Sequence, residues 1–266
     1  MSDRRLTARG GSEKDDRYAR QRDLPAIGAT GQERLARARV LVAGCGALGT
    51  NAAELLARAG VGRIALVDSD TLEATNLQRQ ALVGENDLGR LKASATAEAL
   101  RRINSTITVT HEVVRVDRGN VERLIAGADL ILDGFDNLPS RYLLNDACVK
   151  HRVPWVFAAV AATCGMVLPI LPDEGPCLRC LFPDPAPEER VLTAGNAGLI
   201  NTIPRAIVAM QVTLGIRVLL GLAPQPASLV VFDIWEGTYT AQAASRDERC
   251  VCCGEGRYEF LEGGDA

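Results

Sequence analysis

Aromatic residues and an excess of basic charge are the first things that this sequence lacks. Only 4% of its residues are aromatic, and its formal net charge is -3. Proteins that stack on single-stranded nucleic acid need aromatic side chains, and proteins that bind nucleic acid or anionic membranes are usually basic. The composition therefore argues against nucleic acid and membrane partners.

The chain also lacks a secretory signal and a clear membrane span. Residues 1–16 are polar and charged, without the apolar core of a signal peptide. The most apolar stretch, 206–223, is interrupted by Gln211 and Arg217 and is short for a span. We therefore expect a disordered N-terminus at 1–16, a buried core helix at 206–223, and a cytoplasmic protein.

What the sequence does contain is an alternation of apolar runs and helical segments. Strands are expected at 40–43, 63–68, 107–114, 129–133 and 153–160, and helices at 31–38, 47–59, 91–103 and 138–150. Strands that alternate with helices of ten or more residues are typical of right-handed βαβ units and a parallel sheet. The pattern predicts an α/β fold with a Rossmann-like, doubly wound sheet.

The pattern changes after residue 165. Strands are expected at 166–171, 229–234 and, weakly, 238–243, with one long helix at 201–220. These strands are expected to be antiparallel and either to extend the same sheet or to pack beside it. The segment 183–198 is rich in proline, glycine and charge, which predicts a mobile loop.

A glycine-rich loop, Gly44-Cys45-Gly46-Ala47-Leu48-Gly49, lies between the first strand and its helix. In that context GxGxxG lets backbone N–H groups approach a phosphate closely. Asp68 ends the next strand, where an acidic residue usually accepts hydrogen bonds from ribose hydroxyls. The loop alone fits a nicotinamide dehydrogenase as well as an ATP enzyme, or a tight turn without a ligand.

Polar residues that suit a triphosphate follow Asp68. Asn76, Arg79 and Gln80 come shortly after it, and Lys92 begins a predicted helix. Arg can bind phosphate oxygens through two donors, and a lysine ammonium can neutralise their charge. A dehydrogenase has no need of this group, although Lys92 alone would be an ordinary solvated lysine.

Asp136 and Asn137 follow the strand 129–133 at its carboxyl end. Ligands of open parallel sheets bind at that edge, so Asp136 is placed to hold Mg²⁺ against phosphates. The alternative is that Asp136 or Asn137 caps the helix that begins at residue 138.

Eight cysteines include two CxxC units, 177–180 and 250–253. Two such pairs predict tetrahedral Zn²⁺, and four thiolates leave no open position, so the site would be structural. Spacing favours Cys177, Cys180, Cys250 and Cys253, with Cys252 as an alternative to Cys250. A redox function for one CxxC would leave the second pair unexplained.

Together these motifs resemble a known family. RYARQ (17–21), GCGALG (44–49), VDSD (67–70), TNLQRQ (75–80), GRLK (89–92), DGFDN (133–137) and the two CxxC units occur in family order. The sequence is similar to the MoeB/ThiF/HesA group, relatives of the ubiquitin-activating enzymes, over residues 17–254.

The resemblance implies an enzyme that uses ATP and Mg²⁺ to attach AMP to the C-terminal glycine of a small ubiquitin-like sulfur-carrier protein ending in Gly-Gly, with release of pyrophosphate. It implies a nucleotide site made of Gly44, Gly46, Ala47, Asp68, Asn76, Arg79, Gln80, Lys92, Asp136 and Asn137. Asp68 would hold the ribose and Asp136 the magnesium ion. Asn76, Arg79 and Lys92 would contact phosphates, and Arg20 would reach the ATP of a partner subunit in a homodimer.

The resemblance also implies a division of the chain. Residues 17–160 would form a nucleotide-binding half and 161–254 a half that binds the carrier and zinc, followed by a tail at 255–266. Many relatives carry a cysteine just ahead of a TAG-like sequence, but here 190–195 read RVLTAG and no cysteine lies between Cys180 and Cys250. With no room for an appended rhodanese domain either, we expect adenylation without a covalent enzyme intermediate, and a separate sulfur donor.

Three other hypotheses stay open at this point. The same chemistry would serve to adenylate a peptide C-terminus in a natural-product pathway. An NAD-dependent oxidoreductase and a catalytically inactive binding scaffold are the two alternatives of a different class.

Overall fold

The computed structural model describes residues 17–185, 192–224 and 226–263. The predicted disorder of 1–16 and the centre of the predicted mobile loop, 186–191, lie outside these residues. The described end of that loop contains a short helix, α8 (Ala194–Ala197).

One eight-stranded sheet forms the centre of the molecule, in the order β3-β2-β1-β4-β5-β6-β7-β8. The first five strands are parallel to one another: β1 (Arg39–Ala43), β2 (Arg63–Val67), β3 (Thr108–Glu112), β4 (Leu130–Asp133) and β5 (Trp155–Ala161). The last three pair antiparallel: β6 (Cys164–Ile170), β7 (Ser228–Asp233) and β8 (Thr238–Ala243). The predicted fold class is confirmed, and the antiparallel strands extend the same sheet.

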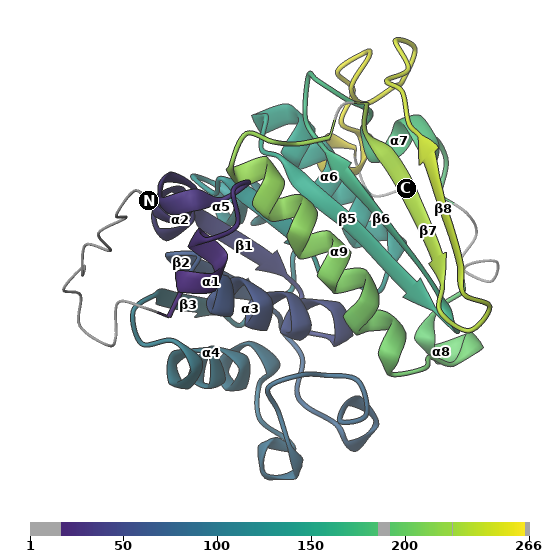
Figure 1. The fold of residues 1–266 in the computed structure, drawn as a ribbon. Helices are drawn as coiled ribbons and strands as arrows, with labels where there is room; N and C mark the ends of the chain where they lie inside the picture. Colours follow the sequence, from purple (N-terminus) through teal and green to yellow (C-terminus); the bar gives the residue numbers. More distant parts are fainter. Residues whose placement is uncertain (1–16, 186–191, 225, 264–266) are drawn as a thin grey trace, which may run out of the picture.

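Helices cover both faces of the sheet (Figure 1). The helices α2 (Gly28–Arg37), α3 (Ala47–Ala59), α4 (Lys92–Ile103) and α9 (Thr202–Leu219) share one buried cluster, and α5 (Val121–Ile125) and α6 (Leu138–His151) share the other. Because side chains alternate along a strand, Val40 and Val42 enter the first cluster and Leu41 and Ala43 the second.

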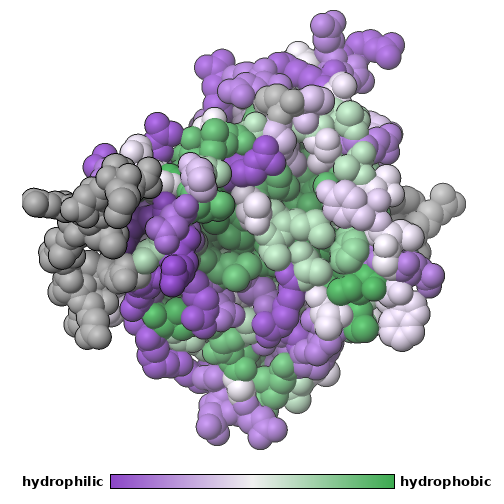
Figure 2. All heavy atoms as spheres, viewed as in Figure 1, coloured by the Kyte–Doolittle hydropathy of each residue, from purple (hydrophilic) through white to green (hydrophobic). Residues whose placement is uncertain are grey.

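Helix α9 crosses the sheet over β5 and β6 (Figure 1). Among the described helices it alone has the length and apolar composition of a membrane span. Its inner side is buried, with Ile203, Ile207 and Val208 in the core. The predicted core helix is confirmed in part, because it ends at Leu219 rather than at residue 223 and only its inner side is buried. Its outer side leaves apolar residues in the middle of the face seen in Figure 2.

Several short elements have no counterpart in the predicted pattern. They are α1 (Ala19–Arg22), α5, α7 (Leu178–Leu181), α8, α10 (Glu259–Glu262) and two 3-10 turns, η2 (Ala74–Asn76) and η3 (Glu85–Asp87). Helix α10 lies in the segment predicted to be a tail. It packs on α6, where the rings of Phe260 and Tyr142 stack with centroids 4.7 Å apart and the backbone N–H of Phe260 donates to Asp146.

Candidate active site

The glycine loop joins β1 to α3 at the carboxyl edge of the parallel strands. Gly44 has φ +99°, a conformation that favours glycine. A Cβ at Gly49 would lie 1.8 Å from the carbonyl oxygen of Gly44, and one at Gly134 would lie 2.6 Å from the same atom. Three backbone segments therefore cross here in contact. No described side chain caps α3, whose first turn also lacks acidic residues. Its N-terminus can receive an anion.

Replacing Gly49 with alanine is expected to destabilise the protein by about 3 kcal/mol, because the new methyl group meets backbone that cannot rotate away. Gly84→Ala is the matched control, since a Cβ there meets nothing within 4 Å and φ is -139°. Urea denaturation of the two variants measures the difference. Equal stabilities would show that the crossing tolerates a side chain.

A cavity of about 750 Å³ opens beside this loop and continues over β5, β6 and β7. Every residue predicted to bind the nucleotide lines it: Gly44, Gly46, Ala47, Asp68, Asn76, Arg79, Gln80, Lys92, Asp136 and Asn137. The fold thus brings together residues from five separate segments of the sequence, and their individual roles remain predictions.

Asp68 is fixed at the end of β2 by two backbone donors. The N–H groups of Cys45 and Asp70 donate to its two carboxylate oxygens, each at 2.7 Å. Burial raises the pKa of Asp68, and these hydrogen bonds oppose the shift. The carboxylate is thereby held beside the glycine loop, where a ribose would lie.

Lys92 is not a solvated surface residue. Its side chain is only 12% exposed, and its ammonium lies 2.8 Å from a carboxylate oxygen of Asp70. Asp70 is itself well exposed, at 64%. The ion pair keeps the ammonium at the cavity wall, and an incoming phosphate can compete with Asp70 for it.

The three polar residues of the segment after β2 differ in their bonding. Asn76 is buried and accepts from the N–H of Glu73, which fixes the 3-10 turn. The guanidinium of Arg79 donates only to the carbonyl of Thr75 and forms no ion pair with a described residue. Gln80 is 6% exposed, and its Oε1 has no partner in the described structure. A buried polar atom without a partner at a cavity wall is typical of a ligand site.

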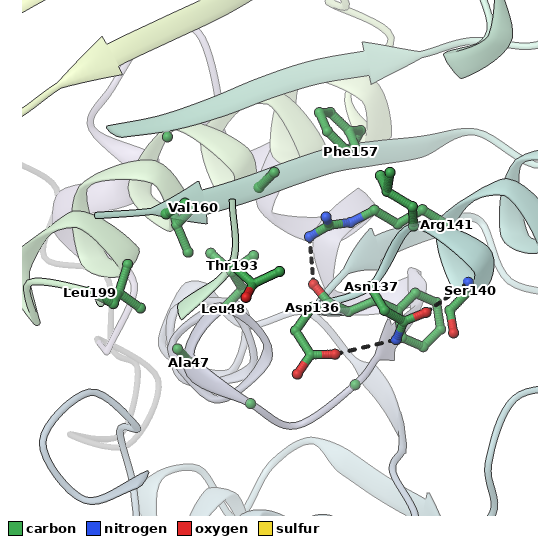
Figure 3. A pocket seen from close by; sticks show the side chains of 18 of the residues that line it. Ala47, Leu48, Asp136, Asn137, Ser140, Arg141, Phe157, Val160, Thr193 and Leu199 are labelled. Atoms are coloured by element: carbon green, nitrogen blue, oxygen red, sulfur yellow. Dashed lines mark hydrogen bonds between the residues drawn. The ribbon is translucent and has the colours of Figure 1, made fainter. Parts of the chain in front are cut away.

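The side chains of Asn137 and Asp136 make different contacts (Figure 3). The side chain of Asn137 accepts from the N–H of Ser140 and so caps α6. Among the described residues, Asp136 accepts only from the amide of Asn137, at 3.3 Å, and its carboxylate points into the cavity. The cap alternative is therefore correct for Asn137, and Asp136 stays available for a cation.

Arg20 does not lie at this cavity. Its side chain is 99% exposed and its nearest ionic partner is Asp23, at 3.8 Å. The neighbouring residues Tyr18 and Gln21 are anchored: the hydroxyl of Tyr18 accepts from Asn104, and Gln21 donates to the carbonyl of Ala59. Helix α1 thus presents Arg20 outward. Its predicted use by a partner subunit stays a prediction.

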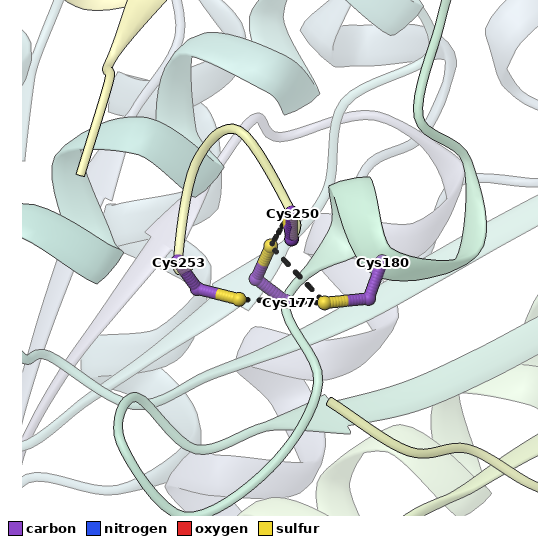
Figure 4. A group of neighbouring side chains, drawn as sticks. All are labelled: Cys177, Cys180, Cys250 and Cys253. Carbon is purple, nitrogen blue, oxygen red and sulfur yellow. Dashed lines mark hydrogen bonds between the residues drawn. The ribbon is translucent and has the colours of Figure 1, made fainter. Parts of the chain in front are cut away.

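Four cysteine sulfurs meet on the α6 side of the sheet (Figure 4). The Sγ atoms of Cys177, Cys180, Cys250 and Cys253 all lie within 4.8 Å of one another. Cys252 is buried beside them and accepts from the side chain of Asn145 at 3.3 Å. The geometry selects Cys250 over Cys252, and the cluster can hold a metal ion through four sulfurs.

Comparison with known proteins decides the family. Residues 18–252 match the ThiF family. The chain belongs to the ThiF family. A relative of similar length is the sulfur carrier protein adenylyltransferase of Thermus thermophilus, 38% identical over 249 residues, which are 91% of this chain and 92% of that protein.

Other relatives are longer than this chain. The adenylyltransferase and sulfurtransferase MOCS3 of Xenopus laevis is 38% identical over 239 residues, and this chain covers 89% of its own length but only 53% of that relative. Among solved structures, E. coli MccB with ATP has a TM-score of 0.79 at 24% identity, covering 90% of this chain and 74% of MccB. This last likeness supports the fold.

The sequence patterns missed two groups at the cavity. Arg141 on α6 forms a buried ion pair with Asp133, with 2.9 Å between Nε and the carboxylate. Burial raises the pKa of Asp133 and Arg141 opposes the shift. Cys164 and Asp233 meet across β6 and β7, with 2.8 Å between Sγ and the carboxylate. The one signal for Arg141 was its position directly before the apolar residues Tyr142, Leu143 and Leu144 of α6. For Cys164 and Asp233, only strand pairing reveals the contact.

Proposed function

We propose that this protein adenylates the C-terminal carboxylate of a small ubiquitin-like sulfur-carrier protein, with ATP as the donor and pyrophosphate as the leaving group. The observation that carries the proposal is the composition of the single cavity described above. One end offers backbone donors and the cations of Arg79 and Lys92, and the other end is a floor of small and apolar residues. Asp136 follows β4, which lies between β1 and β5 in the sheet.

The nucleotide end fits a triphosphate in three ways. The uncapped start of α3 and the glycine loop offer N–H groups. Arg79 is a cation without an ion partner among the described residues. Gln80 has an oxygen that lacks a donor. The pyrophosphate of NAD carries less negative charge than a triphosphate and needs fewer cations, which disfavours an NAD-dependent oxidoreductase.

The floor of the cavity fits a narrow polypeptide tail. Ala159, Ala161 and Ala162 line it from β5 and its turn, and Met166 and Val231 from β6 and β7. Small side chains leave room for a main chain, and a Gly-Gly terminus needs little width. The tail would approach the nucleotide along β5.

In the proposed reaction no side chain of the protein forms a covalent bond. A carboxylate oxygen attacks the α-phosphorus, the bond to the bridging oxygen of pyrophosphate breaks, and no proton is transferred. The protein has to align the two reactants and neutralise charge on the phosphates. Arg79 and Lys92 supply cations, and the carboxylate of Asp136 fits Mg²⁺, which when bound would neutralise phosphate charge.

We assign the four-sulfur cluster to structural Zn²⁺, because four thiolates match its tetrahedral preference and leave no open position. We further propose a cytoplasmic homodimer in which Arg20 serves the partner's cavity. The outward position of Arg20 and the apolar outer side of α9 support this (Figure 2). The absence of cysteine between Cys180 and Cys250 supports a separate sulfur donor.

The test is ATP–pyrophosphate exchange in the presence of small proteins ending in Gly-Gly encoded near this gene. Exchange that requires one of them, and that is lost when its last glycine is removed, is the expected result. Exchange with a short peptide alone would favour the natural-product alternative. NAD binding without ATP binding in a titration would favour the oxidoreductase, and no exchange with any partner would favour the inactive scaffold.

A further inference from the structure

Arg141 has two donors that the fold does not use. The residue is 6% exposed. Its Nε donates to Asp133, and its Nη2 donates to the carbonyls of Phe135 and Ala158. Its Nη1 forms no hydrogen bond with a described residue and keeps some accessible surface. Since Arg141 lines the cavity, Nη1 faces that space.

The position of this guanidinium is rigid. Two nitrogens of the guanidinium donate hydrogen bonds to three acceptors, which come from β4, the loop after β4, and β5. The ring centroid of Phe157 lies 5.4 Å from the central carbon of the guanidinium. Figure 3 shows the side chain reaching from α6 toward the loop that carries Asp136, with Phe157 beside it. A donor fixed in this way loses little conformational entropy when a ligand arrives.

The surroundings separate Arg141 from the phosphate end. Arg79 and Lys92 come from the segments after β2, whereas Arg141 is held against β4 and β5. Phe157 and Ala159, which neighbour its contact Ala158 on β5, lie on the apolar floor. Arg141 therefore stands where the proposed polypeptide tail ends and the nucleotide begins.

We propose that the free Nη1 donors of Arg141 bind the C-terminal carboxylate of the polypeptide substrate and orient it toward the α-phosphorus. The inference rests on the proposed function and adds the residue that recognises the reacting group. A carboxylate that must attack phosphorus should not lose its electron density to a strong cation. Because Asp133 already neutralises Arg141 at 2.9 Å, the guanidinium orients the carboxylate through hydrogen bonds while its charge is largely balanced.

The experiment compares two forms of the Gly-Gly carrier, one with its natural C-terminal carboxylate and one with a C-terminal amide made by semisynthesis. Their affinities are measured by calorimetry in the presence of an ATP analogue that cannot be cleaved between the α- and β-phosphates. The wild-type protein should bind the carboxylate form roughly ten- to a hundredfold more tightly, the range expected for hydrogen bonds to a charged group. No preference in the wild type would overturn the inference without any variant.

Arg141→Lys keeps a positive charge beside Asp133 but removes the planar pair of guanidinium donors. The preference for the carboxylate form of the carrier should therefore fall to about threefold or less, while the affinity for the ATP analogue stays within about threefold. Arg179→Lys is the matched control. Arg179 is equally buried and pairs with Glu259 at 2.8 Å, but it does not line the cavity. Its variant should keep the full preference. Retention of the preference in Arg141→Lys, or equal weakening of both carrier forms, would assign Arg141 a structural role only.

One further readout does not depend on a folded variant. If Arg141→Lys does not fold, nitrogen NMR of the wild-type guanidinium replaces it: the Nη resonances of Arg141 should shift with the carboxylate form and not with the amide. An absence of that shift overturns the inference. Failure of the proposed function looks different, because the wild type would then bind neither carrier form and catalyse no exchange.

Discussion

Replacing Arg79 with alanine is expected to lower carrier-dependent ATP–pyrophosphate exchange by about 100- to 1,000-fold, the loss typical of removing one preorganised charge donor. The structure explains why the effect should be large. Arg79 donates only to the carbonyl of Thr75, so its charge is not balanced by a described carboxylate. Lys92 by contrast is paired with Asp70. Of these two cations, Arg79 is therefore the more available to a phosphate.

Arg90→Ala is the matched control for this prediction. Arg90 lies close in sequence and pairs with Asp87 and Glu98 at 2.6 and 2.7 Å, but it is absent from the cavity wall. Exposed pairs of this kind contribute little to stability, so exchange should stay within about twofold. If Arg79→Ala retained more than a tenth of the wild-type rate, the phosphates would have to lie elsewhere in the cavity.

Replacing Cys177 with serine is expected to abolish stoichiometric metal binding and to destabilise the fold by more than about 4 kcal/mol, as the loss of a structural metal site does. The melting temperature should fall by roughly 8–16 °C. Cys177 and Cys250 are 73 residues apart, and the segment between them carries α9 and β7. Losing the connection through the four-sulfur cluster therefore frees a long part of the chain.

Two cysteine variants act as controls for the metal site. Cys164→Ser, outside the four-sulfur cluster, should keep both the metal and the stability. Cys252→Ser should keep one metal ion per chain, because Cys252 is bonded to Asn145 and its sulfur is not among the four that converge. Elemental analysis together with thermal melting separates these outcomes. Loss of metal in Cys252→Ser alone would exchange the assignments of Cys250 and Cys252.

Much of the fold could be predicted because the pattern of each element is local. The apolar run at 40–43 and the glycines after it required a buried strand and a tight turn, and the structure shows both. The sequence also predicted that the two CxxC pairs meet, because a tetrahedral metal site needs four such ligands. Helix α10 was missed because four residues carry no period, and its position depends on the stacking of Phe260 against Tyr142.

The site was predictable where a motif follows a strand, and not where its members meet through tertiary structure. Asp136 and Asn137 stood next to each other in the sequence, yet only the geometry shows that Asn137 caps α6 while Asp136 faces the cavity. Arg141 was missed because its contacts with Asp133 and Ala158 cross from α6 to two strands. Periodicity marks a residue as inward-facing but does not say which of its hydrogen-bond donors stay unused.

The long separation in sequence between the two CxxC pairs of the four-sulfur cluster also has a consequence during synthesis. Strands β1 to β5 precede Cys177 in the chain, so the parallel part of the sheet leaves the ribosome first. At about 5–20 residues per second, the first cysteine pair waits roughly 4–15 s for the second, which lies 73 residues later. During that interval the proposed zinc site would consist of Cys177 and Cys180 alone on a nascent chain. With zinc bound as we propose, the supply of metal in the cell would bear on the last stage of folding, after the parallel strands have been synthesised.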